Sequence, residues 1–127
     1  MEGFVNIQPV FSDNKERTTE SLRKIYDNHF KMIEIISNIS SEYLNETNLK
    51  GKKVLLKPNW VRHSVKDTDE LCLRTNDNFI LAALEVVMSN SPASVVIGDA
   101  PVQGCRWERM ITKEFTNSVN EISKKYS

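Results

Sequence analysis

Long hydrophobic runs and an excess of either charge are missing from this chain of 127 residues. No apolar run approaches the roughly 20 residues needed to cross a bilayer, so we expect no membrane partner. The 17 basic and 17 acidic residues cancel, and therefore no overall field favours nucleic acid or an anionic membrane. The first residues, Met1 to Phe4, lack the basic flank and apolar stretch of a secretory signal. These absences predict a cytoplasmic protein that binds neither membrane nor nucleic acid.

Cysteine is also scarce, because Cys72 and Cys105 form no CxxC pair and are too few for a disulfide framework. We expect both to be free thiols. A zinc site built from these two cysteines with His63 and Asp99 would need closer ligand spacing than the sequence offers, so no metal is predicted. Gly-x-Gly-x-x-Gly and Gly-x₄-Gly-Lys-Ser/Thr are both absent, which leaves a nucleotide cofactor without support. The cofactor, if the protein uses one, stays unknown.

Two short apolar runs, Val54–Leu56 and Val95–Ile97, are each followed by polar residues and a proline. They are too short for buried helices, and their β-branched content is typical of strands covered on both faces. A weaker apolar segment from Phe4 to Phe11 is interrupted by Pro9, which cannot donate to a strand ladder. This segment predicts an edge strand or an extended arm.

Apolar residues at helical spacing predict three helices. The first spans about residues 20–44, with Thr18 or Thr19 as its cap, and a turn at residues 48–51 follows it. The second is capped by Thr75 or Asn76 and stops before Pro92. Its inner side is expected to carry Phe79, Ile80, Ala83, Leu84, Val87 and Met88. The third presents an apolar stripe from residue 107 to residue 126.

The resulting order, β-α-β-α-β-α, predicts one α/β domain over residues 1–127, with a small, mainly parallel sheet in a three-layer-like arrangement. Parallel sheets need both faces covered and their edges protected. Three amphipathic helices are just enough to cover a sheet of three short strands. A partner, a homo-oligomer or a missing C-terminal half would cover the faces and edges more completely.

Polar residues follow both predicted strands, where the ligands of open α/β sheets gather. Lys57 could hold a phosphate or carboxylate, with Asn59 as a neutral donor. Alternatively, Lys57 is solvated or pairs with Asp99. Asp99 itself could bind Mg²⁺, take a proton or accept a ribose hydroxyl, or it could cap the backbone N–H groups of residues 101–104.

Further candidates lie in the two loops that follow the strands. Thr75 and Asn76 are expected to cap a helix, although a helix N-terminus is also a site for anions. Arg106 is a further candidate contact for an anionic ligand. Arginine and aromatic surfaces also stack nucleic-acid bases, but the balanced charge argues against that use of this region. We expect Trp107 to pack in the core and Trp60 to cover the cleft at the strand ends.

Three motifs together resemble the N-terminal part of the domain of unknown function 362 family. They are Val-Leu-Leu-Lys-Pro-Asn at 54–59, Arg-Thr-Asn-Asp at 74–77 and Val-Val-Ile-Gly-Asp-Ala-Pro at 95–101. The resemblance implies an α/β fold with a parallel sheet and brings no established reaction. Members of this family are two or more times longer, so the resemblance identifies the chain as the truncated, N-terminal half of a larger domain. The cysteine runs that bind iron–sulfur clusters in some members are absent here.

Two functional hypotheses follow. In the first, the chain is part of an enzyme that acts on a small anionic substrate, either phosphorylated or carboxylated. Asp99 would then be the catalytic residue, and the substrate would be held by Lys57, Asn59, Thr75, Asn76 and Arg106. In the second, the chain is a non-catalytic module or an inactive fragment that needs a partner or dimerisation.

Overall fold

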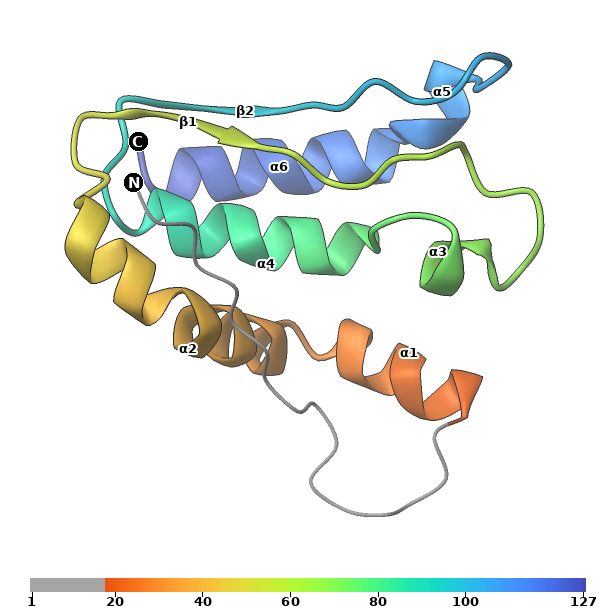
Figure 1. Cartoon of the computed structure of the whole chain (residues 1–127), viewed down its shortest axis with the longest axis horizontal. Helices are drawn as coiled ribbons and strands as arrows, with labels where there is room; N and C mark the ends of the chain where they lie inside the picture. Colours follow the sequence, from red (N-terminus) through yellow and green to blue (C-terminus); the bar gives the residue numbers. More distant parts are fainter. Residues whose placement is uncertain (1–17) are drawn as a thin grey trace.

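The computed structural model describes residues 18–127, which form a mixed α/β fold (Figure 1). Its elements are, in order, α1 (Thr19–Asp27), α2 (His29–Thr47), β1 (Lys53–Leu56), α3 (Asp69–Cys72), α4 (Asp77–Met88), β2 (Ser94–Ile97), α5 (Trp107–Met110) and α6 (Lys113–Lys125). The strand predicted for Phe4 to Phe11 lies outside the described residues. Within the described part of the chain, no helix combines the length and apolar character that a bilayer crossing requires.

Both predicted central strands are confirmed, and they pair in parallel with Lys53 opposite Ser94 and Leu56 opposite Ile97. Exposure alternates along each strand, because every second side chain points to the same face of a sheet. Leu55 and Val96 remain 64% and 58% exposed. The expected cover on both faces is therefore not found among residues 18–127. Helices α4 and α6 lie on one side of the strands in Figure 1.

The first predicted helix is in fact two helices that meet at Asn28. The backbone N–H of Asn28 donates to Ile25 O at 3.2 Å, and its side-chain oxygen accepts the N–H of Lys31 at 3.0 Å. One asparagine thus ends α1 and caps α2, a role for which its short polar side chain is well suited. The predicted cap at Thr18 and the predicted turn at residues 48–51 are both confirmed, with Gly51 in the left-handed region at φ 72°.

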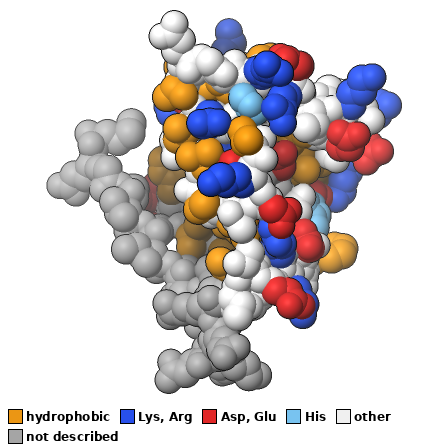
Figure 2. Space-filling view, turned by 90° about the vertical axis from the view of Figure 1, so that its right-hand side faces the viewer, with side chains coloured by type: hydrophobic (Ala, Val, Ile, Leu, Met, Phe, Trp, Pro, Cys, Tyr) orange, Lys and Arg blue, Asp and Glu red, His pale blue; other side chains and the backbone are white. Residues whose placement is uncertain are grey.

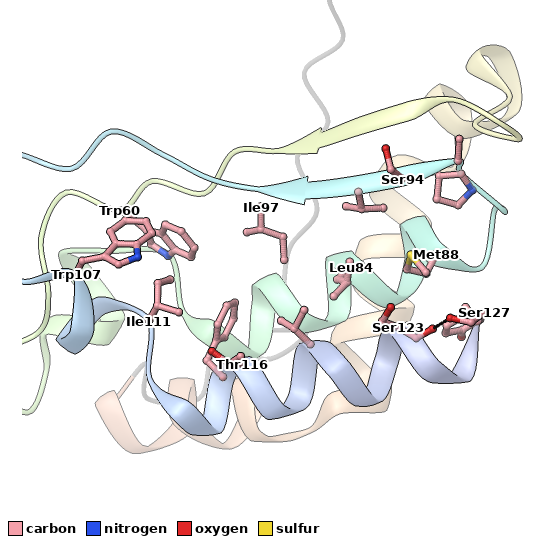
Figure 3. A pocket seen from close by; sticks show the side chains of 16 residues that line it. Trp60, Leu84, Met88, Ser94, Ile97, Trp107, Ile111, Thr116, Ser123 and Ser127 are labelled. Carbon is pink, nitrogen blue, oxygen red and sulfur yellow. Dashed lines mark hydrogen bonds between the residues drawn. The ribbon is translucent and has the colours of Figure 1, made fainter.

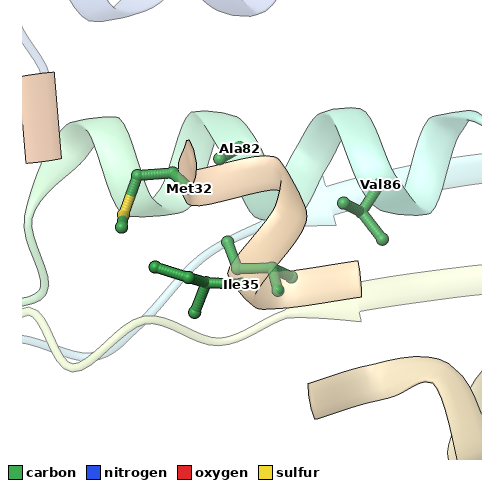
Figure 4. Close-up of a cluster of buried hydrophobic side chains, with 5 residues drawn as sticks. Met32, Ile35, Ala82 and Val86 are labelled. Carbon is green, nitrogen blue, oxygen red and sulfur yellow. The ribbon is translucent and has the colours of Figure 1, made fainter. Parts of the chain in front are cut away.

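Helix α4 is the centre of the core and is buried on two sides. On one side it packs against α2 in a cluster drawn in Figure 4, made of Met32, Ile35, Ile36, Ala82 and Val86. On the other side a second cluster gathers Trp60, Ile80, Leu81, Met110 and Phe115. The predicted inner face omitted Leu81, Ala82 and Val86, because an amphipathic stripe was expected to face one layer only.

The last predicted helix is also divided, into α5 and α6, with Thr112 between them. The Thr112 hydroxyl accepts the N–H of Phe115 at 3.1 Å and so begins α6. The expectations for the two tryptophans are reversed. Trp60 is 1% exposed and packs edge-to-face on Phe115, with ring centroids 6.1 Å apart, whereas Trp107 is 49% exposed and covers Trp60.

A buried carboxylate joins three of the helices. Glu85 of α4 contacts His29 Nε2 at the start of α2 at 2.6 Å, and Lys125 and the Tyr126 hydroxyl at the end of α6. Burial alone would raise the pKa of Glu85, but hydrogen bonds from Lys125, His29 and Tyr126 outweigh it and lower the pKa to about 2. The carboxylate therefore stays charged inside the helical layer.

Candidate functional site

The two polar side chains predicted to meet at the strand ends do meet. Lys57 follows β1, Asp99 follows β2, and their Nζ and Oδ1 atoms lie 2.7 Å apart. Parallel strands end at the same edge of the sheet, which is why Lys57 and Asp99 become neighbours although they lie far apart in the chain. The Asp99 side chain is almost completely buried, while Lys57 is largely exposed. This is the ion pair that the sequence had left open as an alternative to ligand binding.

Asp99 also holds the loop that follows β1, because its second oxygen accepts the Trp60 N–H at 2.7 Å. The hydrogen bond from Lys57, followed by those from the backbone N–H groups of Trp60 and Ala100, lowers the pKa of Asp99 to about 2. A carboxylate with so low a pKa is a weak proton acceptor at neutral pH. Asp99 therefore holds a loop, but its backbone donors are Trp60 and Ala100 rather than the expected N–H groups of residues 101–104. The catalytic role of Asp99 stays a prediction.

Asn59, Thr75 and Asn76 connect the end of β1 to the start of α4. The Asn59 N–H donates to the Thr75 hydroxyl at 2.8 Å, and the Thr75 N–H donates back to Asn59 O at 3.0 Å. Asn76 is the N-cap of α4, since its side-chain oxygen accepts the Asn78 N–H at 2.9 Å. The expected capping role is thus confirmed for Asn76, and Thr75 instead fixes the approach of the loop.

The loop between β1 and α4 contains the short helix α3 and is attached to α1. Arg23 reaches from α1 to Glu70 Oε1 at 3.0 Å and to the backbone oxygen of Asp67 at 2.6 Å. Asp69 accepts the N–H groups of Val65 and Lys66, and these two hydrogen bonds lower its pKa. These contacts hold the middle of the long loop against α1.

A cavity of about 440 Å³, the polar cavity, lies between α1, this loop, the start of α4 and α5. Its lining residues are Arg23, Tyr26, Asp27, Ser64, Glu70, Arg74, Asn76, Asp77, Asn78, Arg109 and Thr112. Of the predicted site residues, Asn76 lines this cavity. Lys57 and Thr75 line a smaller, separate pocket of about 180 Å³. The structure thus divides the predicted site between two places.

Arg74 is a functional candidate that the sequence placed in a motif without assigning it a role. Its side chain is 5% exposed, contacts Asp77 and donates to Met110 O at 3.4 Å. Its Nε atom is buried and has no hydrogen-bond partner among residues 18–127. Burial raises the pKa of Asp77, and the charge of Arg74 opposes that shift. A buried donor without a partner is rare and marks this wall of the cavity.

Three arginines surround a buried histidine beside the cavity. His63 is 6% exposed, and its Nδ1 accepts the Arg106 N–H at 3.0 Å, which joins the loops that follow β1 and β2. Burial lowers the pKa of His63, and the charges of Arg109, Arg62 and Arg106 lower it further. Within the described part of the chain no carboxylate pairs with these three arginines. Basic side chains gather in the upper part of the face shown in Figure 2.

Arg109 belongs to both features, since it lines the polar cavity and stands near His63. It was missed in the sequence because it lies outside the loop that follows β2. Its spacing from Arg106, three residues along a helical turn, is the signal that could have indicated it.

The remaining site chemistry is limited. Among residues 18–127, no group of three or more His, Cys, Asp or Glu side chains is placed to hold a metal ion. Cys72 and Cys105 are free thiols, as the sequence predicted.

No protein-family model matches the chain, and neither the curated proteins nor the solved structures include a match. The resemblance to the domain of unknown function 362 family therefore stays a prediction. The function has to be inferred from the site itself.

Proposed function

We propose that this α/β domain binds a small phosphorylated or carboxylated molecule in the polar cavity, beside the carboxyl ends of its two strands. The observation that carries the proposal is Arg109. It lines the cavity, is exposed to solvent, and has no ion-pair partner among the described residues. A guanidinium that no carboxylate neutralises can donate two parallel hydrogen bonds to an oxyanion.

The other cavity residues have complementary parts in this proposal. Arg23 and Arg74 already pair with Glu70 and Asp77, so they shape the walls. The unpartnered Nε of Arg74 is one further donor. Side chains such as Asn78 can hydrogen-bond the uncharged part of a ligand. Arg106 supplies a second positive charge outside the cavity.

Lys57 and Asp99 receive a different role from the one first expected. Asp99 neutralises Lys57, so we assign the ligand's anionic group to Arg109. The ion pair then fixes the loop that forms one wall of the cavity. Catalysis by Asp99 in a larger enzyme, and a cytoplasmic location, remain parts of the proposal. The complete β-α-β-α-β-α unit is also part of the proposal, because its first predicted strand lies outside the described residues.

Calorimetric titration with inorganic pyrophosphate tests this assignment. We expect saturable binding to the unaltered chain and affinity at least tenfold weaker for Arg109→Ala, because one charge-assisted contact contributes roughly 1.5–3 kcal/mol. Lys124→Ala, which removes one exposed positive charge from the far end of α6, is the matched control and should leave affinity unchanged. Equal affinity in the Arg109→Ala variant would refute the role of Arg109.

A specific observation also favours the second hypothesis, a module that works beside a partner. One face of the sheet exposes Leu55 and Val96, and an apolar groove follows the outer side of β2. Exposed apolar surface of this kind is typical of interaction sites.

A further inference from the structure

The apolar groove runs between β2 and α6 and has a volume of about 560 Å³. In Figure 3, Trp60 and Trp107 close one end, while Met88, Ser94, Ser123 and Ser127 stand at the other. The complete lining is Trp60, Leu84, Met88, Pro92, Ala93, Ser94, Val95, Ile97, Trp107, Ile111, Phe115, Thr116, Val119, Ser123, Tyr126 and Ser127. None of these side chains carries a formal charge, although 27% of the chain's residues are charged.

The side of the groove formed by α4 and α6 is wider than the side formed by β2. Helices α4 and α6 pack side by side and both contribute lining residues. Packed helices lie about 8–10 Å apart, which is roughly twice the spacing of about 4.8 Å between strands. Among residues 18–127 the sheet has two strands, and β2 has no neighbour on its outer side. The single strand β2 therefore covers only part of the surface formed by α4 and α6.

Two sets of hydrogen-bonding groups at the groove lack partners in the described part of the chain. The outer edge of β2 presents the backbone groups of a strand that is paired on one side only. At the tryptophan end, Trp60 is 1% exposed, and its indole Nε1 is buried without an acceptor. Buried donors are rarely left unpaired. The unpaired edge of β2 and the unpartnered Trp60 Nε1 would both be satisfied by a ligand that has backbone or carbonyl groups as well as apolar surface.

We propose that an extended segment of a partner protein adds to the outer edge of β2 as a third strand. Main-chain hydrogen bonds hold such a segment, and alternate side chains fill the surface below it. Because the lining is uncharged, the inward side chains are apolar and small enough to lie over Phe115 and Val119. An oxygen of the segment accepts the hydrogen bond of Trp60 Nε1. This inference does not depend on the anion site, which lies in a different cavity.

A second copy of this chain is a poor occupant of the same edge. If the β2 strands of two copies paired edge to edge, each α6 would come to lie beneath the strand of the other copy. The strands would be about 4.8 Å apart, whereas the two helices need about 8–10 Å. A lone strand has no such conflict, and for this reason we assign the edge to a partner's extended segment.

The test uses a synthetic peptide of alternating valine and threonine with lysines at both ends, added to the full chain. Trp60 and Trp107 are its only tryptophans and both line the groove, so tryptophan fluorescence reports on occupancy directly. We expect a saturable blue shift, because a strand would cover the half-exposed Trp107. A peptide with proline in place of threonine keeps the valines but loses backbone donors, and it should bind at least tenfold more weakly.

Two variants of adjacent residues on α6 supply the matched comparison. Thr116 is exposed and lines the groove, whereas Asn117 is exposed and lies outside it. Thr116→Lys should weaken the alternating peptide at least tenfold, and Asn117→Lys should leave its affinity unchanged. Thr116→Glu serves as a second variant, with helical content checked by circular dichroism.

Four results would overturn the proposal. They are no saturable response at millimolar alternating peptide, equal affinity in the Thr116 variants, equal binding of the proline peptide, and a blue shift that depends on protein concentration without peptide. Equal binding of the proline peptide would indicate that the groove binds apolar side chains without strand pairing. The last, with a dimer in sedimentation, would assign the groove to a second copy.

Discussion

Two carboxylates, Asp99 and Glu85, reach a pKa of about 2 in different surroundings. Asp99 does so mainly through the hydrogen bond from Lys57, at the sheet edge. Burial raises the pKa of Glu85, but hydrogen bonds from three side chains lower it by more. These side chains are His29 of α2, Lys125 of α6, and Tyr126, which directly follows α6. The first holds a loop, and the second joins helices. Neither has the pKa near neutrality that suits a general base.

Replacing Glu85 tests the second of these roles. We expect Glu85→Gln to lower the free energy of unfolding at pH 7 by about 2 kcal/mol, because hydrogen bonds to a charged group are lost. The folded-state pKa lies below the ordinary value of 4.5, so this stabilisation is complete above about pH 5 and is lost as the pH falls toward 2. Urea unfolding at pH 7 and at pH 3 measures the difference between the two proteins, which should shrink at pH 3.

Glu121→Gln is the control for this measurement, because Glu121 is exposed on α6. It should change stability by a few tenths of a kcal/mol at most. A destabilisation by Glu85→Gln that is the same at both pH values would contradict the ionic network.

At the level of elements, the positions of the two central strands and of the caps at Thr18 and Asn76 were predictable, while the helix breaks were not. The apolar runs at 54–56 and 95–97 gave both strands, and the polar residues around them gave their ends. The breaks at Asn28 and Thr112 escaped because apolar spacing continues through each of them. A single capping side chain decides each break, and Asn or Thr also occurs inside unbroken helices when its side chain points to solvent.

The break between α1 and α2 should therefore depend on Asn28. Asn28→Ala removes the acceptor for the Lys31 N–H and should destabilise the protein by about 1 kcal/mol, the usual cost of losing a cap. Asn38→Ala, at an exposed position inside α2, should be neutral or slightly stabilising because alanine favours helix. Urea unfolding at pH 7 compares the two. If Asn28→Ala were as stable as the unaltered chain, the break would have another cause.

For the whole molecule, the strand-end rule located Lys57 and Asp99 correctly but not the cavity. The rule holds because parallel strands bring their carboxyl ends to one edge. The polar cavity depends on how α1 and α5 dock against that edge, and docking of this kind leaves no periodic signal in the sequence. Arg109 and Arg74 became candidate site residues only when these elements were assembled. The exposure of one sheet face could not be predicted either, because an apolar run does not indicate which face of a strand the helices cover.

The claim that Arg109 receives an anion at this edge can be tested most directly by NMR of the arginine side chains. In the ¹⁵N-labelled chain, the Nε–Hε signals of Arg109 and Arg74 should shift and saturate together as inorganic pyrophosphate is added, and the Arg74 shift should weaken in Arg109→Ala. Arginine signals that do not move, or that move equally around the whole molecule without saturating, would contradict it.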